Sequence, residues 1–322
     1  MVNKPIANSQ QPSPSPLKRV IRVGRRALVS LSRRNYASAK AYGLLSLHWA
    51  NLRQKQPLII FQMGKVGSTT IARSLEAVGL KMSVFHVHVL SEEGLKRHEQ
   101  IYRQSFSERR RIDRQLLASY YLRRRLEKGI KGQPWKIITL VRDPIARNLS
   151  SFFEILDLEY KHHGYHHRIQ EGNGAVPSAA QLANTFLQEF PHETPLIWFD
   201  RELKGVFGID VYAQPFPHAK GYELYRGDRV EVLLLRLEDL NRCTAPAFKE
   251  FLNLDQVDLV KVNVGQQKYY SKAYTEVLNS VKLPESYLDQ MYSSRYATHF
   301  YSPDEVQRFR ANWAVTDEAF KA

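Results

Sequence analysis

The chain has 322 residues, of which 43% are apolar and 25% charged, so it can bury a sizeable core as one large α/β domain with appendages. Its single cysteine, Cys243, excludes an internal disulfide. The formal net charge is +15, but eleven of the 47 Lys and Arg lie in residues 1–56, which contain no Asp or Glu. The other 36 basic residues nearly balance the 32 acidic ones, so the charge does not indicate a nucleic-acid-binding protein.

The N-terminal part divides into two segments before the main domain, which is predicted at residues 57–322. Residues 1–17 are rich in Pro, Ser and Gln and are predicted to be disordered. Residues 18–56 are predicted to form a basic helical arm, whose longest apolar run is too short to cross a bilayer and too far from the N-terminus for a secretory signal. Two interpretations of the arm stay open, namely peripheral contact with an anionic membrane or packing on the domain with a solvated basic face.

The sequence PLIIFQMGKVGSTTIAR, residues 57–73, predicts a strand, a tight turn and a helix. The apolar run of residues 58–61 has strand length, and the following helix is expected to turn Ile71, Leu75 and Val78 inward. This succession leaves unpaired N–H groups at the start of the helix, where they suit a phosphate group.

The residue types in this turn also suit the binding of an anion. Gly64 and Gly67 allow close approach of the backbone, and Lys65 places a positive charge beside the anion. Because the lysine precedes the Gly-Ser-Thr sequence, the turn is not a Walker A motif, and the anion is predicted to bind without a metal. An ordinary turn with Ser68 as helix N-cap is the alternative. The hydroxyl donors are Ser68, Thr69 and Thr70.

A second stretch, KIITLVRDPIARNLSSFF at residues 136–153, predicts another strand that is followed by a helix. Asp143 is expected to cap this helix and Pro144 to be its first residue. A guanidinium group at a strand end beside a hydroxyl suits a second phosphate, although an Arg–Asp pair that caps a helix is the alternative. The residues predicted for this phosphate are Arg142, Arg147 and Ser150.

Together, KVGSTT and VRDPIARNLSSFF resemble the paired nucleotide motifs of the sulfotransferase superfamily, in the form of its carbohydrate sulfotransferases. The resemblance implies a P-loop-like three-layer α/β fold with a mostly parallel central sheet flanked by helices, and a helical C-terminal part. It also implies 3′-phosphoadenosine 5′-phosphosulfate (PAPS) as co-substrate. Its 5′-phosphosulfate would meet the loop that includes Lys65, Gly67, Ser68, Thr69 and Thr70, and its 3′-phosphate would meet Arg142 and Ser150.

Further stretches resemble a bacterial group of capsular polysaccharide synthesis proteins. They are DRELKGVFGIDVY, LLLRLEDL and RYATHFYSPDEV. Lys268 lies where related sulfotransferases bring a basic loop over the nucleotide, although the local sequence departs from the Arg-Lys-Gly of the cytosolic enzymes.

The sequence MSVFHVHVL at residues 82–90 alternates as a strand does and places His86 and His88 on one face. Ligands of open α/β sheets bind beyond the carboxyl ends of the strands, and His88 is nearer that end. We therefore expect His88, or less favourably His86, to accept the proton of an acceptor hydroxyl. A hydrogen-bonded core histidine is the alternative.

Three other stretches leave alternatives open. Residues 91–135 are helical and basic, which suits either a surface that guides an anionic glycan or a solvated helix. Residues 160–176 contain four histidines, and we interpret them as a mobile loop on the substrate side rather than a metal site. Trp198, Phe199 and Asp200 suit either sugar binding or core packing.

The sequence therefore predicts transfer of a sulfuryl group from PAPS to a carbohydrate hydroxyl of a polysaccharide or glycolipid, with Lys65 stabilising the departing charge. A kinase, or a non-catalytic capsule-assembly protein, is the alternative. A glycosylation sequon at residues 148–150 lies inside the second phosphate motif. With the single cysteine and the lack of a secretory signal, this favours a cytoplasmic enzyme, in contact with the membrane periphery if the arm binds lipid.

Overall fold

The computed structural model describes residues 35–52, 56–80, 82–105, 112–130, 132–163, 178–260 and 282–314. Residues 1–17, Lys268 and most of the histidine-rich loop lie outside these ranges. A five-stranded sheet in the order β2-β1-β3-β5-β4 forms the centre, and only β4 runs antiparallel to its neighbour. The predicted mostly parallel α/β sheet is therefore confirmed. The strands are β1 Leu58–Phe61, β2 Val84–Val87, β3 Trp135–Val141, β4 Tyr222–Arg226 and β5 Val230–Arg236.

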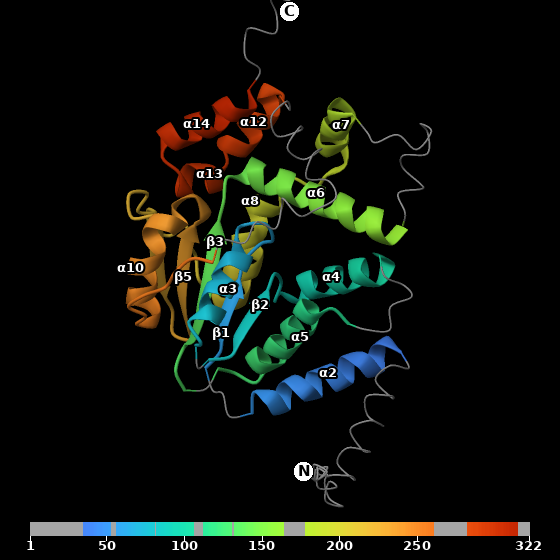
Figure 1. Ribbon diagram of the computed structural model, residues 1–322, viewed down its shortest axis with the longest axis vertical. Helices are drawn as coiled ribbons and strands as arrows, with labels where there is room; N and C mark the ends of the chain where they lie inside the picture. Colours follow the sequence, from blue (N-terminus) through green and yellow to red (C-terminus); the bar gives the residue numbers. More distant parts are fainter. Residues whose placement is uncertain are drawn as a thin grey trace, which may run out of the picture.

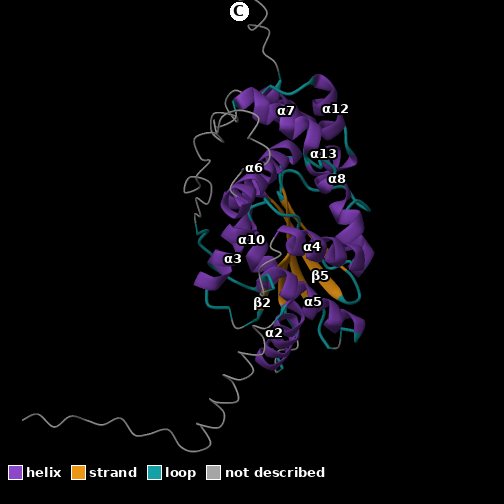
Figure 2. Cartoon of the chain, turned by 90° about the vertical axis from the view of Figure 1, so that its right-hand side faces the viewer, coloured by secondary structure: helices purple, strands orange, loops and turns teal. Residues whose placement is uncertain are grey.

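Helices cover both faces of the sheet. In Figures 1 and 2, α3 and α10 lie on one face and α8 on the other, while α5 and α2 extend beyond the β2 edge. None of the helices described is long and apolar enough to cross a bilayer. The α-helices are α2 Tyr36–Ala50, α3 Ser68–Ala77, α4 Glu92–Ser105, α5 Arg114–Glu127, α6 Pro144–His163, α7 Ala179–Glu189, α8 Thr194–Trp198, α9 Gly205–Phe207, α10 Leu240–Leu252, α12 Glu285–Tyr292, α13 Arg295–Phe300 and α14 Pro303–Trp313. A π-helical turn, Phe199–Lys204, follows α8, and a 3-10 turn, Leu237–Asp239, follows β5.

The strands of the parallel part are apolar along most of their length because both faces of the sheet are covered. All four residues of β1 are fully buried, as are most of those in β3 and β5. Helix α3 packs on them through Ile71 and Leu75, as predicted. The prediction that Val78 turns inward is wrong, because α3 ends at Ala77 and Val78, its C-cap, is exposed.

A second apolar core lies above the carboxyl edge of the sheet. It joins α6 and α7 to the C-terminal helices α12, α13 and α14, which stand together at the top of Figure 1. Its fully buried side chains include Phe153, Phe186 and Met291. The predicted helical C-terminal part is therefore present, and it covers the edge where ligands of α/β sheets bind.

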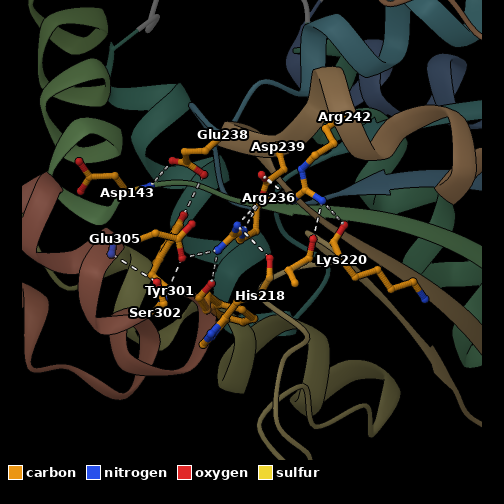
Figure 3. Close-up of polar contacts among 12 residues, drawn as sticks. Asp143, His218, Lys220, Arg236, Glu238, Asp239, Arg242, Tyr301, Ser302 and Glu305 are labelled. Atoms are coloured by element: carbon orange, nitrogen blue, oxygen red, sulfur yellow. Dashed lines mark hydrogen bonds and ion pairs between the residues drawn. The ribbon is translucent and has the colours of Figure 1, made fainter.

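Arg236, at the end of β5, connects the sheet to these helices (Figure 3). Its guanidinium group is paired with Asp239 and with Glu305 at 2.8 Å. It also donates to the carbonyl oxygens of Phe300 at 3.1 Å and His218 at 3.2 Å. A buried cation with this many acceptors is held firmly, and it fixes α13 and α14 against the end of β5.

We predict that Arg236→Ala lowers the free energy of unfolding by about 3–5 kcal/mol, because Asp239 and Glu305 keep their charge and lose their buried partner. Arg242→Ala is the matched control, since Arg242 pairs with the other oxygen of Asp239 but its side chain is 53% exposed, against 3% for Arg236. The control should cost less than about 1 kcal/mol. Urea denaturation of both variants checks this, and equal losses would contradict the role given to Arg236.

Candidate anion-binding site

The register of the sheet brings the predicted site residues to one edge. Phe61 of β1 pairs with Val87 of β2, and Val141 of β3 pairs with Arg236 of β5. The residues that follow these strand ends are the β1–α3 loop at residues 62–67, His88, Arg142 and the turn that begins at Leu237. Four segments far apart in the sequence therefore meet at the carboxyl edge, where an α/β sheet offers a ligand site.

The β1–α3 loop has the backbone conformation of an anion cradle. Lys65 has a φ of 73° and Gly67 a φ of 88°, both in the left-handed region. A Cβ atom at Gly67 would stand 2.4 Å from Cδ1 of Leu237, so a larger residue there would have to displace that side chain as well as adopt the positive φ. Gly67 is the N-cap of α3, and no side chain caps the helix. The N–H of Thr70 donates to the carbonyl oxygen of Gly67 at 3.1 Å, so the amides that suit an anion are those at the very start of the helix.

Two arginines of the β3–α6 segment hold the carbonyl groups of this loop. Arg142 donates from Nη1 to the carbonyl oxygen of Lys65 at 3.1 Å, and Arg147 donates from Nε to that of Gly64 at 3.0 Å. Arg147 also donates to Oδ1 of Asn148 at 2.9 Å. The two guanidinium groups thus neutralise the carbonyl dipoles that would otherwise repel an anion in the loop.

Arg147 is buried, and burial lowers its pKa to about 10, so its charge persists at neutral pH. Its contacts are with the loop and with its own helix, which makes it a positioning residue in this structure. A direct contact between Arg147 and a nucleotide stays a prediction.

The main chain of Arg142 is fixed by a buried tyrosine. The N–H of Arg142 donates to the hydroxyl of Tyr296 at 3.1 Å, and this hydroxyl donates to the carbonyl oxygen of Arg142 at 2.9 Å. Tyr296 lies on α13, more than 150 residues along the chain. The C-terminal helix α13 therefore fixes the backbone position of Arg142 at the end of β3.

The predicted cap of α6 is confirmed. The carboxylate of Asp143 accepts a hydrogen bond from the N–H of Ile145 at 3.0 Å. It also accepts from the hydroxyl of Tyr292 at 3.1 Å and from the indole of Trp313. Burial raises the pKa of Asp143, and these donors counteract the shift. Asp143 is therefore committed to holding α6 in place.

Lys65 reaches from the loop to α6. Its Nζ lies 2.9 Å from Oε1 of Glu154, a residue that the sequence analysis did not single out. Glu154 follows Ser150 by four residues, one helical turn, and Ser150 is half-buried. The structure thus brings Lys65 and the helix that carries Ser150 together. The signal that could have identified Glu154 is this four-residue spacing on the same face of the helix.

His88 is oriented by groups of its neighbours. Its Nδ1 lies 2.9 Å from the carbonyl oxygen of Gln62, so we assign the ring proton to Nδ1 and the lone pair to Nε2. This Nε2 lies 4.0 Å from the position of a Cβ on Gly64 and so faces the β1–α3 loop. The indole of Trp198 donates to the carbonyl oxygen of His88 at 2.9 Å. Burial and the nearby His86 lower the pKa of His88 to about 4.

His86 lies farther from the edge than His88, and the two rings are 5.1 Å apart. The amide of Gln62 contacts its Nε2 at 3.2 Å, and burial lowers its pKa. His88 is therefore the better placed of the two histidines to face the loop.

Several other expectations have a clear outcome. Trp198 and Phe199 are buried, so they pack in the core and do not form an open platform for a sugar, and Asp200 pairs with Arg295.

Asn148 of the glycosylation sequon is fully buried and donates to the carbonyl oxygen of His192 at 3.0 Å. The folded chain therefore has no room for a glycan at this sequon.

The comparison with protein families gives a match in the C-terminal half of the chain. Residues 180–302 match the family described as "Putative capsular polysaccharide synthesis protein". The chain is thus similar to a capsule-synthesis family over less than half of its length. No curated protein and no solved structure gives a significant match. The matched span includes Trp198, Arg236 and Tyr296, which contact the site from neighbouring elements, and it includes none of residues 57–73 or 136–153.

The lowered pKa of His88 predicts a pH dependence of stability. The unfolded chain takes up the proton near pH 6.5, whereas the folded chain takes it up only near pH 4, so acid favours unfolding between these values. From pH 7 to pH 5, His88 should cost the wild type about 2 kcal/mol that His88→Gln does not lose. Urea denaturation at both values measures this difference. His48→Gln, an exposed site, should follow the wild type, and a parallel fall in His88→Gln would contradict the shift.

Proposed function

We propose that this protein transfers a sulfuryl group from PAPS to a hydroxyl of a carbohydrate. The observation that carries the proposal is the β1–α3 loop, whose carbonyls are held by Arg142 and Arg147 and whose lysine reaches α6. This arrangement places the loop and the first turns of α6 side by side. The two phosphate-bearing ends of a nucleotide such as PAPS need two such anion sites.

The 5′-phosphosulfate would lie at the start of α3. The amides that follow Gly67 and the hydroxyl groups there would donate to it. The hydroxyls are those of Ser68, Thr69 and Thr70. The 3′-phosphate would lie between Arg142 and Ser150, at the strand end and two turns into α6.

The transfer step follows from the groups that face the loop. The acceptor oxygen forms a bond to sulfur while the bond from sulfur to the bridging phosphate oxygen breaks. Lys65 stabilises the negative charge that builds on that bridging oxygen. The acceptor proton passes to Nε2 of His88, which is unprotonated at neutral pH because of the low pKa. Most of the rate enhancement then comes from positioning and charge rather than from a strong base.

The family match supports the class of acceptor. A capsule-synthesis family acts in the assembly of a polysaccharide, so the acceptor would be a capsular or extracellular polysaccharide or its glycolipid precursor. A second candidate is a non-catalytic protein of capsule assembly on the same fold. The observation in its favour is that the matched residues exclude both nucleotide motifs.

We predict that the full-length protein binds 3′-phosphoadenosine 5′-phosphate in EDTA, and that 5′-AMP binds far more weakly. Arg142→Ala should weaken binding of the bisphosphate by roughly tenfold to a hundredfold, the loss expected for a charge-assisted contact. Isothermal titration calorimetry measures both affinities. No binding by well-folded wild type would refute the proposal and favour the assembly protein, and ATP binding that needs magnesium would favour a kinase.

Lys65→Ala should separate binding from chemistry. We expect turnover of PAPS to fall by about a hundredfold or more, while affinity for the bisphosphate product falls only a few-fold, because the lysine acts on charge that develops during transfer. Radiolabelled sulfate transfer to polysaccharide, measured beside calorimetry, gives both numbers. An equal fall in both would show that Lys65 serves binding alone.

Glu154→Gln should strengthen binding of the bisphosphate by several-fold. The substitution removes a negative charge near the phosphate groups and releases Lys65 from its ion pair. Glu127→Gln is the matched control, since Glu127 pairs with Arg123 on the exposed side of α5 and should leave the affinity unchanged. Weaker binding by Glu154→Gln would mean that the carboxylate orients Lys65 for the ligand rather than competing with it.

A further inference from the structure

Helix α2 has one face that packs and one that does not. Its inner face is fixed to the domain by buried Leu44 and by Lys40, which pairs with Glu99 at 3.0 Å. Gly43 allows the close approach, because a Cβ atom there would stand 2.6 Å from the side chain of Leu117. The helix is therefore held rigidly, and its outer face has a defined orientation.

The outer face of α2 is apolar. Leu45 is 50% exposed and Trp49 66%, and their four-residue spacing places them on one side of α2. Leu52, in the turn that follows α2, is 58% exposed. Ala37 and Ala41 continue the same stripe toward the N-terminus. These are the most exposed large apolar side chains in the described residues apart from Ile101. An aromatic ring and two leucines exposed within eight residues of the chain indicate an interaction surface.

The positive charge of the segment before α2 favours an anionic lipid surface over a second copy of the chain as the partner of this face. The seven Lys and Arg of residues 18–34 directly precede α2 in the sequence, and residues 1–56 contain no acidic residue. Two copies of the chain meeting at this face would bring their basic segments together and repel each other. An anionic lipid surface attracts such a segment and accepts the Leu and Trp side chains without needing hydrogen bonds from the protein.

We propose that Leu45 and Trp49 on the outer face of α2, together with Leu52 in the turn that follows, dock on a membrane that contains anionic lipid. The three side chains enter the headgroup boundary, and the positive charge that the sequence carries before α2 attracts the chain to anionic lipid. This is a peripheral contact, since no helix of the described part could span a bilayer. The inference is independent of the nucleotide and of the transfer reaction.

The contact has a consequence for the candidate site. Only five residues separate Leu52 from β1, so the C-terminal end of α2 lies toward the amino edge of the sheet. The candidate site lies at the carboxyl edge, at the opposite end of the strands (Figure 1). A membrane bound through α2 thus leaves the site facing the aqueous phase, which suits a polymer chain as acceptor.

The test is co-sedimentation of the full-length protein with vesicles. Wild type should bind vesicles of phosphatidylcholine with phosphatidylglycerol, bind vesicles of phosphatidylcholine alone weakly, and lose binding as salt is added. The variant Leu45→Ser/Trp49→Ser/Leu52→Ser should lose more than about tenfold in binding to the anionic vesicles. Ile155→Ser, which changes an exposed isoleucine on α6, is the matched control and should bind as wild type does.

Three results would overturn the proposal. Wild type that binds neither kind of vesicle excludes a membrane contact, and a triple variant that binds like wild type excludes this face of α2. A wild-type dimer in sedimentation velocity that the triple variant abolishes would assign the face to a second copy of the chain. Unchanged thermal melting and bisphosphate binding of the triple variant show that the fold and the nucleotide site are intact, so loss of vesicle binding is read separately from the proposed function.

Discussion

The bonds from Arg142 and Arg147 to the carbonyl oxygens of Lys65 and Gly64 are the interactions on which the candidate site depends. A loop that binds an anion through its amides must direct its carbonyl groups elsewhere and keep them satisfied. Here two cations from the neighbouring strand and helix do this. The same bonds set the distance between the loop and α6, so they also fix how far apart two phosphate groups of one ligand would lie.

The segment that matches the capsule-synthesis family supplies the side chains that fix the backbone at the carboxyl edge of the sheet. Tyr296 fixes the backbone of Arg142, and Trp198 holds the carbonyl of His88. The buried carboxylate of Glu202 accepts from the N–H groups of Leu90 and Ser91 at 2.7 and 2.8 Å, which fixes the turn after His88. Similarity confined to this segment is therefore similarity in the part that positions the candidate site, and the β1–α3 loop and Arg142 lie in the unmatched part.

Much of the local structure could be predicted from the sequence because its causes are local. The apolar run of Leu58–Phe61 forms a strand with the expected bounds, and the Asp143-Pro144 pair begins a helix with the expected cap. The contacts that complete the site could not be predicted, since they join residues far apart in the chain. The pairing of Lys65 with Glu154, and the hydrogen bonds of Tyr296 to Arg142, depend on how α6 and α13 pack over the sheet. A local pattern can also mislead. The helical spacing of apolar residues extends to Val78, but α3 ends at Ala77 and the side chain of Val78 is exposed.

The most direct test of the account is amide hydrogen exchange of the β1–α3 loop and the first turn of α3, residues 62–70, with and without 3′-phosphoadenosine 5′-phosphate in EDTA. We predict slower exchange in this segment and at the β3–α6 junction, and no change in α2. Unchanged exchange in residues 62–70 under conditions that saturate the protein, or equal protection by 5′-AMP, would contradict the claim that this loop and Arg142 form a bisphosphate site.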